Sequence, residues 1–154
     1  MDRIQDLKKR CTGLNYEIMK DDVLMANAKI GSQHYGIEMS QCAPTFILKA
    51  DEIFIALIIQ GSRKIDFKKV EKYLGVKKAI MASRETIFEV TGAPLGSVSL
   101  INPELRTLID EGVPHLPSCY GGCGVEKYTL KIKGSDLVKV TQGEVGEFTK
   151  EGSV

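Results

Sequence analysis

The sequence has little of what would mark a membrane-spanning, secreted or strongly basic protein. Its 154 residues include no tryptophan and only two histidines, and they carry a formal net charge of +1. A domain that binds nucleic acid is often strongly basic, so any contact with RNA must come from local patches of charge. No apolar run reaches the ~18 residues that a membrane helix needs, which predicts a protein without a membrane span.

The first residues are charged rather than apolar. Residues 1–11 read MDRIQDLKKRC and lack the apolar centre of a secretory signal peptide. The four cysteines are therefore expected to be reduced thiols in a cytoplasmic protein. The length fits one compact domain, residues 1–154, in which we find no internal repeat and no low-complexity linker.

Hydrophobic periodicity predicts an α/β domain of the α+β type, with a mixed sheet and helices packed around it. Helices are expected at 3–12, from 21–22 to 31 or 36, at 66–74, at 83–90 and at 136–140. Strands are expected at 15–19, 45–48, 53–59, 78–81, 105–109 and 128–132. Because the run 53–59 is apolar on both faces, it predicts a central, buried strand.

Cys119 and Cys123 form a CxxxC pair, the pattern in this chain that comes nearest to a metal site. A structural zinc ion needs four ligands; His115 is near in sequence, and Cys42 could join only through folding. The incomplete spacing favours unligated thiols, so we predict no metal and no cofactor. A catalytic Cys–His pair remains a second interpretation, because such pairs meet in space rather than in sequence.

The segment 91–99, TGAPLGSVS, is the most suggestive local feature. Small residues let the backbone approach a ligand closely, and successive free amides can bind an oxygen atom. A plain connection between a helix and a strand explains the same residues equally well. The lysines between 68 and 78 could contact phosphates, although a solvated helix face is the simpler interpretation.

Four ordered stretches resemble the YbaK/ProX family, the free-standing relatives of the editing domain inserted in bacterial prolyl-tRNA synthetases. The first is the strand pair 45–59, and the second is the segment 65–75, which is similar to the family's "vDlkklakalG" helix. The third is the segment 82–99, which is similar to its "TG…GGvSP" loop. The fourth is the segment 108–122, which is similar to its "viD" strand end and "GG" turn. The resemblance spans residues 20–148, and the order and spacing of the stretches make it fairly specific.

The resemblance implies a mixed, strongly curved, barrel-like sheet flanked by helices, with a small pocket at one end. It also implies an aminoacyl-tRNA deacylase that acts in trans and hydrolyses the ester of a mischarged tRNA. The expected partners are the aminoacylated 3′ end of tRNA and an aminoacyl-tRNA synthetase, with no membrane and no DNA. The alternative is an editing-domain relative that binds aminoacyl-tRNA or a small ligand without hydrolysis.

The resemblance also implies a set of substrate-binding residues: Pro44, Thr45, Gly92, Gly96, Ser97, Val98, Gly121 and Gly122. Backbone amides at 97 and 98 would hold the substrate carbonyl. Asp110 matches the family's pocket aspartate, which makes it a candidate catalytic residue. Pro44 stands where the family has a lysine, and proline supplies neither an ammonium nor an amide hydrogen. Lys49 is the candidate replacement, although a regular strand would turn it to the opposite face. Leu100 stands where the family's loop has a proline.

Overall fold

The computed structural model describes residues 2–94 and 96–152. The helices are α1 (Arg3–Arg10), α2 (Ala28–Tyr35), α3 (Phe67–Leu74), α4 (Arg84–Thr91) and α5 (Gly134–Thr141), with 3-10 turns η1 (Met39–Gln41) and η2 (Val113–His115). The strands are β1 (Tyr16–Lys20), β2 (Thr45–Ala50), β3 (Ile53–Ile58), β4 (Arg63–Ile65), β5 (Ala79–Met81), β6 (Arg106–Asp110), β7 (Cys119–Gly122), β8 (Tyr128–Ile132), β9 (Glu144–Gly146) and β10 (Thr149–Glu151).

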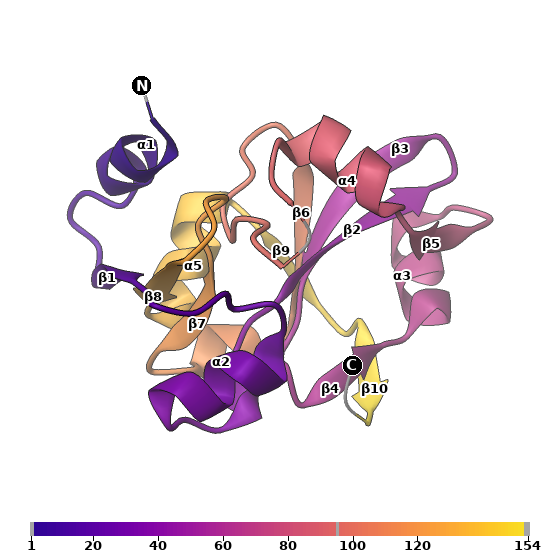
Figure 1. The fold of residues 1–154 in the computed structure, drawn as a ribbon. Coiled ribbons are helices and arrows are strands. Elements are labelled where there is room, and N and C mark those ends of the chain that lie inside the picture. The colour runs from indigo at the N-terminus through magenta and orange to yellow at the C-terminus, as the bar shows by residue number, and fades with distance from the viewer. Residues whose placement is uncertain (1, 95, 153–154) are drawn as a thin grey trace.

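Within these residues the strands form a five-stranded sheet in the order β5-β2-β3-β6-β9, a three-stranded sheet β1-β8-β7 and the pair β10-β4 (Figure 1). The large sheet is mixed, because β3 pairs with β2 antiparallel and with β6 parallel. The predicted α+β fold with a mixed sheet is confirmed. The described strands form no closed barrel. No helix in the described part of the chain is long and apolar enough to cross a membrane.

The central strand β3 is buried on both faces, as its apolar run predicts. Ile55 and Leu57 pack into the cluster that α3 covers, whereas Ala56 packs into the cluster that includes Ile87 of α4. Successive side chains of a strand point to opposite faces, so the sheet separates these two clusters. The face beneath α4 is the one that also carries Val98, from the loop after α4.

The helix predicted from residues 21–22 begins later in the structure. Asn27 is the N-cap of α2, and its side chain accepts a hydrogen bond from the Ile30 amide at 3.0 Å. Asp21 cannot serve as the cap, because it is buried and its carboxylate accepts hydrogen bonds from the Tyr35 and Thr129 side chains. The residues between Asp21 and Asn27 form an irregular connection with a bend at 22–23 instead of a helical turn.

The segment expected to be irregular around residue 121 contains a strand. β7 pairs with β8, and Gly121 and Gly122 lie opposite Leu130 and Thr129. A Cβ on Gly121 would overlap the Leu100 side chain, and one on Gly122 would overlap the Val98 carbonyl oxygen. The two glycines therefore allow the 97–100 segment to pack directly on the strand, and Leu100 fills the space above Gly121.

Candidate functional site

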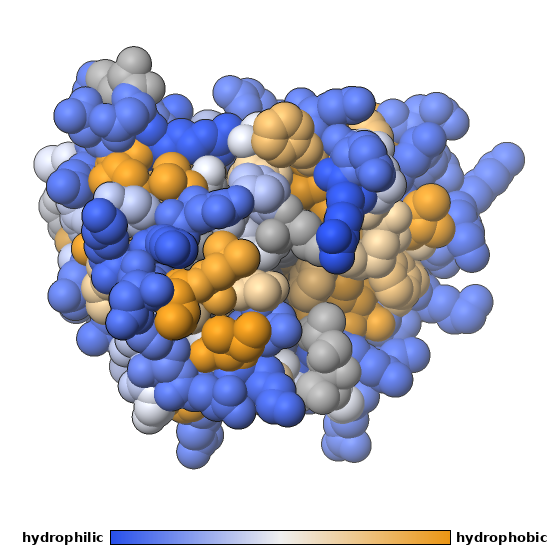
Figure 2. All heavy atoms as spheres, in the orientation of Figure 1, coloured by the Kyte–Doolittle hydropathy of each residue, from blue (hydrophilic) through white to orange (hydrophobic). Residues whose placement is uncertain are grey.

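A cavity of about 500 Å³ lies between α2, the beginning of β2, the loop after α4 and the Gly121–Gly122 strand. Its apolar wall consists of Met25, Met39, Phe46, Ile47, Met81, Ile87 and Val98. Its neutral polar side chains are those of Asn27, Tyr35, Thr45, Tyr120, Tyr128 and Thr129. Figure 2 shows apolar side chains across the middle of this face, where the segment before α2 crosses in Figure 1. A concave, mostly apolar pocket with a few polar groups is the usual form of a ligand site.

A buried carboxylate holds two polar side chains of the cavity wall in place. Asp21 is 5% exposed and accepts hydrogen bonds from the Tyr35 hydroxyl and from Thr129 Oγ1, the latter at 2.7 Å. Burial, together with the hydrogen bond to Asp21, raises the pKa of Tyr35 to about 12, so its hydroxyl stays protonated. The Tyr120 ring packs on Tyr35 with 5.2 Å between centroids. The Tyr35 and Thr129 hydroxyls of this wall are therefore already engaged by a buried carboxylate that lies behind them.

Thr45 brings an unusual polar atom to the cavity wall. Its Oγ1 is buried, and among the described residues it is the one buried side-chain nitrogen or oxygen without a hydrogen-bond partner. Leaving a hydroxyl buried and unpaired costs about 1–3 kcal/mol. Thr45 lies at the first position of β2, opposite Ile58, next to Pro44. Rotation about the Cα–Cβ bond of Thr45 would allow its hydroxyl to form a hydrogen bond with a group in the cavity.

Six of the residues implied by the resemblance surround the cavity: Pro44, Thr45, Gly96, Val98, Gly121 and Gly122. Ser97 is buried behind them, and its amide donates to the Pro94 carbonyl oxygen at 3.0 Å. Gly92 caps the C-terminal end of α4 and faces Arg3, whose guanidinium donates to the Thr91 carbonyl oxygen. Neither Ser97 nor Gly92 is among the residues that line the cavity.

Lys49 and Asp110 also lie outside the cavity lining. Lys49 is in register with Phe54 of β3 and Ile80 of β5, two residues beyond Ile47, which does line the cavity. Asp110 is the last residue of β6, on the side of the sheet where the chain's C-terminal strand docks. Neither residue lines the cavity together with the six residues above.

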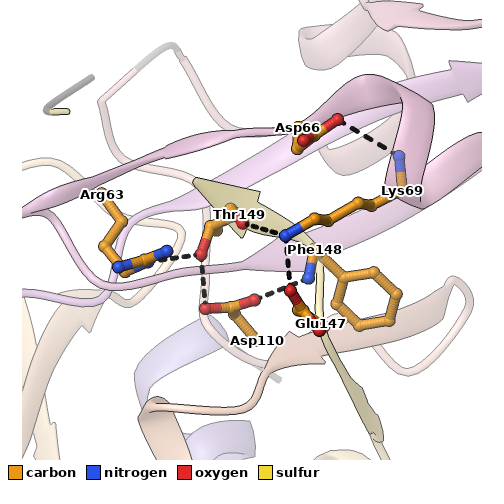
Figure 3. A network of polar contacts seen from close by, with 7 residues as sticks. All are labelled: Arg63, Asp66, Lys69, Asp110, Glu147, Phe148 and Thr149. Carbon is orange, nitrogen blue, oxygen red and sulfur yellow. Dashed lines mark hydrogen bonds and ion pairs between the residues drawn. The ribbon is translucent and has the colours of Figure 1, made fainter. Parts of the chain in front are cut away.

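Asp110 instead fastens the C-terminal strand to the core (Figure 3). Its carboxylate is 2% exposed; Oδ1 accepts from the Phe148 amide and Oδ2 from Thr149 Oγ1, both at 2.8 Å. Thr149 Oγ1 in turn accepts from Arg63 Nε at 2.6 Å. Lys69 Nζ binds the Thr149 carbonyl oxygen at 3.0 Å. Both carboxylate oxygens of Asp110 are thus engaged in holding β10 beside β4.

Sequence reasoning did not single out the residues that α2 contributes. Ala28, Lys29, Gly31 and Tyr35 all line the cavity. Positions 28, 31 and 35 share one face of a helix by their spacing, which is the signal that could have identified this wall. The signal is weak because the sequence pattern places the start of this helix at residues 21–22, whereas α2 begins at Ala28.

The cysteines form no metal site in the described part of the chain. No group of three or more His, Cys, Asp or Glu side chains there is arranged to hold a metal ion. The four cysteines are free and buried. Burial raises the pKa of the Cys119 and Cys123 thiols to about 12. Because the thiolate is the nucleophile, these two thiols are poorly suited to catalysis.

The family model described as an aminoacyl-tRNA editing domain matches residues 25–140. The chain belongs to this family. Every residue that lines the cavity, from Met25 to Thr129, falls inside the matched range. The helix α1 and the strands β1, β9 and β10 fall outside it.

Curated relatives include proline–tRNA ligases. That of Caldicellulosiruptor bescii is 27% identical over 119 residues, which cover 71% of this chain and 21% of the ligase. That of Thermosipho melanesiensis is 24% identical over 124 residues, covering 73% of this chain and 22% of the ligase. The chain thus spans about a fifth of the length of these relatives.

Two crystal structures share the fold over nearly the whole chain. One, of a hypothetical protein, has a TM-score of 0.88 at 21% identity and covers 97% of this chain and 100% of its own. The other, of a proposed trans-editing enzyme for prolyl tRNA synthetase, has a TM-score of 0.85 at 20% identity and covers 96% of this chain and 95% of its own. At these identities the likeness establishes the fold.

Proposed function

We propose that the protein is an aminoacyl-tRNA deacylase that hydrolyses the ester between an amino acid and the 3′ end of a mischarged tRNA. The observation that carries this proposal is the position of the cavity, whose entire lining lies within the residues matched by the editing-domain family. The relatives that are proline–tRNA ligases support a role beside a synthetase. The fold shared with a proposed trans-editing enzyme for prolyl tRNA synthetase supports action in trans. Such a role belongs in the cytoplasm, where tRNA is charged.

In this proposal the cavity sorts the amino acid by size and shape. The methionines, Phe46 and the aliphatic side chains give an apolar surface against which an amino-acid side chain packs. The glycines at 121 and 122 let the 97–100 segment approach the strand closely, which fixes the width of the cavity on that side. Because the Ser97 amide already donates to Pro94, the Val98 amide is the better candidate for holding the ester carbonyl.

The wall supplies no base for the attacking water. The described residues that line the cavity include no carboxylate and no histidine. We therefore assign proton transfer to the substrate, whose terminal ribose carries a hydroxyl beside the ester. Water adds to the carbonyl carbon, the carbon–oxygen bond to the ribose breaks, and the departing ribose oxygen takes up a proton. The products are a free amino acid and an uncharged tRNA.

A panel of mischarged tRNAs tests the proposal. Release of the amino acid is measured with catalytic amounts of protein, and hydrolysis of at least one ester above the buffer rate is expected. One observation favours a second candidate, binding without cleavage: Pro44 lines the cavity and brings no ammonium to it. Tight binding of mischarged tRNA with no hydrolysis of any ester would support that candidate and exclude the deacylase.

A further inference from the structure

Lys29 is the one charged side chain among the described residues that line the cavity. It follows the first residue of α2 and is exposed to solvent, so it lies at the rim rather than in the interior. The rest of the lining consists of apolar residues, glycines and neutral polar side chains. A ligand that enters this cavity therefore meets a single positive charge, and meets it at the entrance.

The ammonium of Lys29 has no anionic partner within the described part of the chain. The ion pairs and the His34–carboxylate contacts found there involve other residues. The hydroxyls of Tyr35, at the other end of α2, and of Thr129, on β8, already donate to Asp21. Lys29 is thus free to bind an anionic group of a ligand.

We propose that Lys29 binds the phosphodiester that joins the terminal adenosine to the rest of the tRNA. This inference rests on the proposed deacylase function. Near its reacting ester the substrate carries two charges, the positive α-ammonium of the amino acid and the negative phosphodiester on the other side of the last ribose. A cation at the rim repels the first and attracts the second. The amino acid therefore enters the uncharged interior, and the phosphodiester stays at the entrance beside Lys29.

This assignment makes Lys29 a positioning residue. A contact with the phosphodiester is the same in the ground state and in the transition state, so its loss raises KM and leaves kcat unchanged. Phosphate contacts set the register of a nucleic acid without reading its sequence. They also release counterions, so each contact on a single strand adds about 0.7 to the dependence of log affinity on log salt.

The test compares Lys29→Ala and Lys29→Arg with a matched control, Lys150→Ala. Lys150 is also an exposed lysine, lies in β10 and is not part of the cavity lining. In Figure 1, β10 lies on the far side of β4 from α2. Each variant is assayed on the same amino acid esterified to tRNA, to adenosine 5′-monophosphate and to adenosine. The third substrate lacks the phosphate and contains every other group near the ester.

Lys29→Ala is expected to raise KM about fivefold on the two phosphate-containing esters, the upper range for an exposed ion pair. The KM for the adenosine ester should not change. The slope of log KM against log salt concentration on the tRNA substrate should fall by about 0.7. Lys29→Arg should restore both values for the phosphate-containing esters. Lys150→Ala should match the wild type on all three esters. Equal losses on all three substrates, a fall in kcat alone, or no change with Lys29→Ala would overturn the assignment.

If the wild type hydrolyses none of these esters, the proposed deacylase function fails, and the phosphate contact is then judged by binding alone. The probes are adenosine 5′-monophosphate and adenosine, titrated against the wild type and Lys29→Ala by calorimetry. Preference of the wild type for the monophosphate, lost in Lys29→Ala, upholds the contact. Equal binding of the two probes, or a preference that survives the substitution, refutes it.

Discussion

Replacing Asp110 with alanine removes the acceptor of two hydrogen bonds that hold the C-terminal strand. Both bonds, from the Phe148 amide and from Thr149 Oγ1, are 2.8 Å long and buried. The resemblance to the editing family places this aspartate in the pocket, whereas in the structure it lies outside the cavity lining. The substitution therefore separates a role in stability from a role in the reaction.

The expected loss of stability follows from those contacts. Each hydrogen bond to a charged group contributes about 1.5–3 kcal/mol, and the abandoned amide and hydroxyl remain in a buried site. Asp110→Ala should therefore lower the free energy of unfolding by about 3–5 kcal/mol. For a domain of this size each kcal/mol shifts the melting temperature by about 2–4 °C, so the variant should melt roughly 6–20 °C lower.

Urea unfolding and the hydrolysis rate per folded molecule, both measured at a temperature where the variant is folded, provide the assay. Thr149→Val is the matched control, because it removes one of the two donors and keeps the side chain's shape. It should cost less than Asp110→Ala, and the two changes together should cost less than their sum, because the residues are in direct contact. An Asp110→Ala protein of unchanged stability and abolished hydrolysis would refute this reasoning.

Three further predictions concern the cavity and the buried thiols. Gly122→Ala should lower kcat/KM at least tenfold on every ester, because the new Cβ would displace the Val98 carbonyl; circular dichroism controls for folding. Thr45→Val should raise the free energy of unfolding by about 1 kcal/mol, because it removes an unpaired buried hydroxyl; a destabilised variant would disprove that. Above pH 9 the stability should fall, by about 1.4 kcal/mol per pH unit for each of Cys119 and Cys123. Unfolded thiols lose their protons near pH 9 and these folded ones near pH 12, so the stabilisation is complete below pH 9 and is lost as the pH rises toward 12; urea titrations across this range measure it.

Much of the fold could be predicted because local signals agree with the tertiary structure. α3 and α4 lie where helices are expected at 66–74 and 83–90, and Asp66 and Ser83 cap them by accepting hydrogen bonds from the Lys69 and Thr86 amides. The apolar run of β3 gave the centre of the sheet. β7 escaped prediction because Gly121 has low strand propensity, and its place in the sheet depends on Leu100, which packs where a Cβ would be.

The site was harder to predict than the fold. The loop and strand residues of the cavity were predicted from the resemblance. Lys29, in contrast, is one of many lysines in the sequence, and it can be singled out only once the structure shows that the other residues lining the cavity carry no charge. Asp110 shows the converse: its partners Phe148 and Thr149 are 38 and 39 residues away in sequence, so nothing local to Asp110 indicates that both its oxygens are engaged.

Single-turnover kinetics decide whether this cavity hydrolyses the ester of mischarged tRNA. The protein is held in excess over a mischarged tRNA labelled in its amino acid. Release of the label should be faster than in buffer, and its rate should saturate with protein concentration. Release at the buffer rate for every amino acid tested, under conditions where the tRNA is fully bound, would contradict this activity.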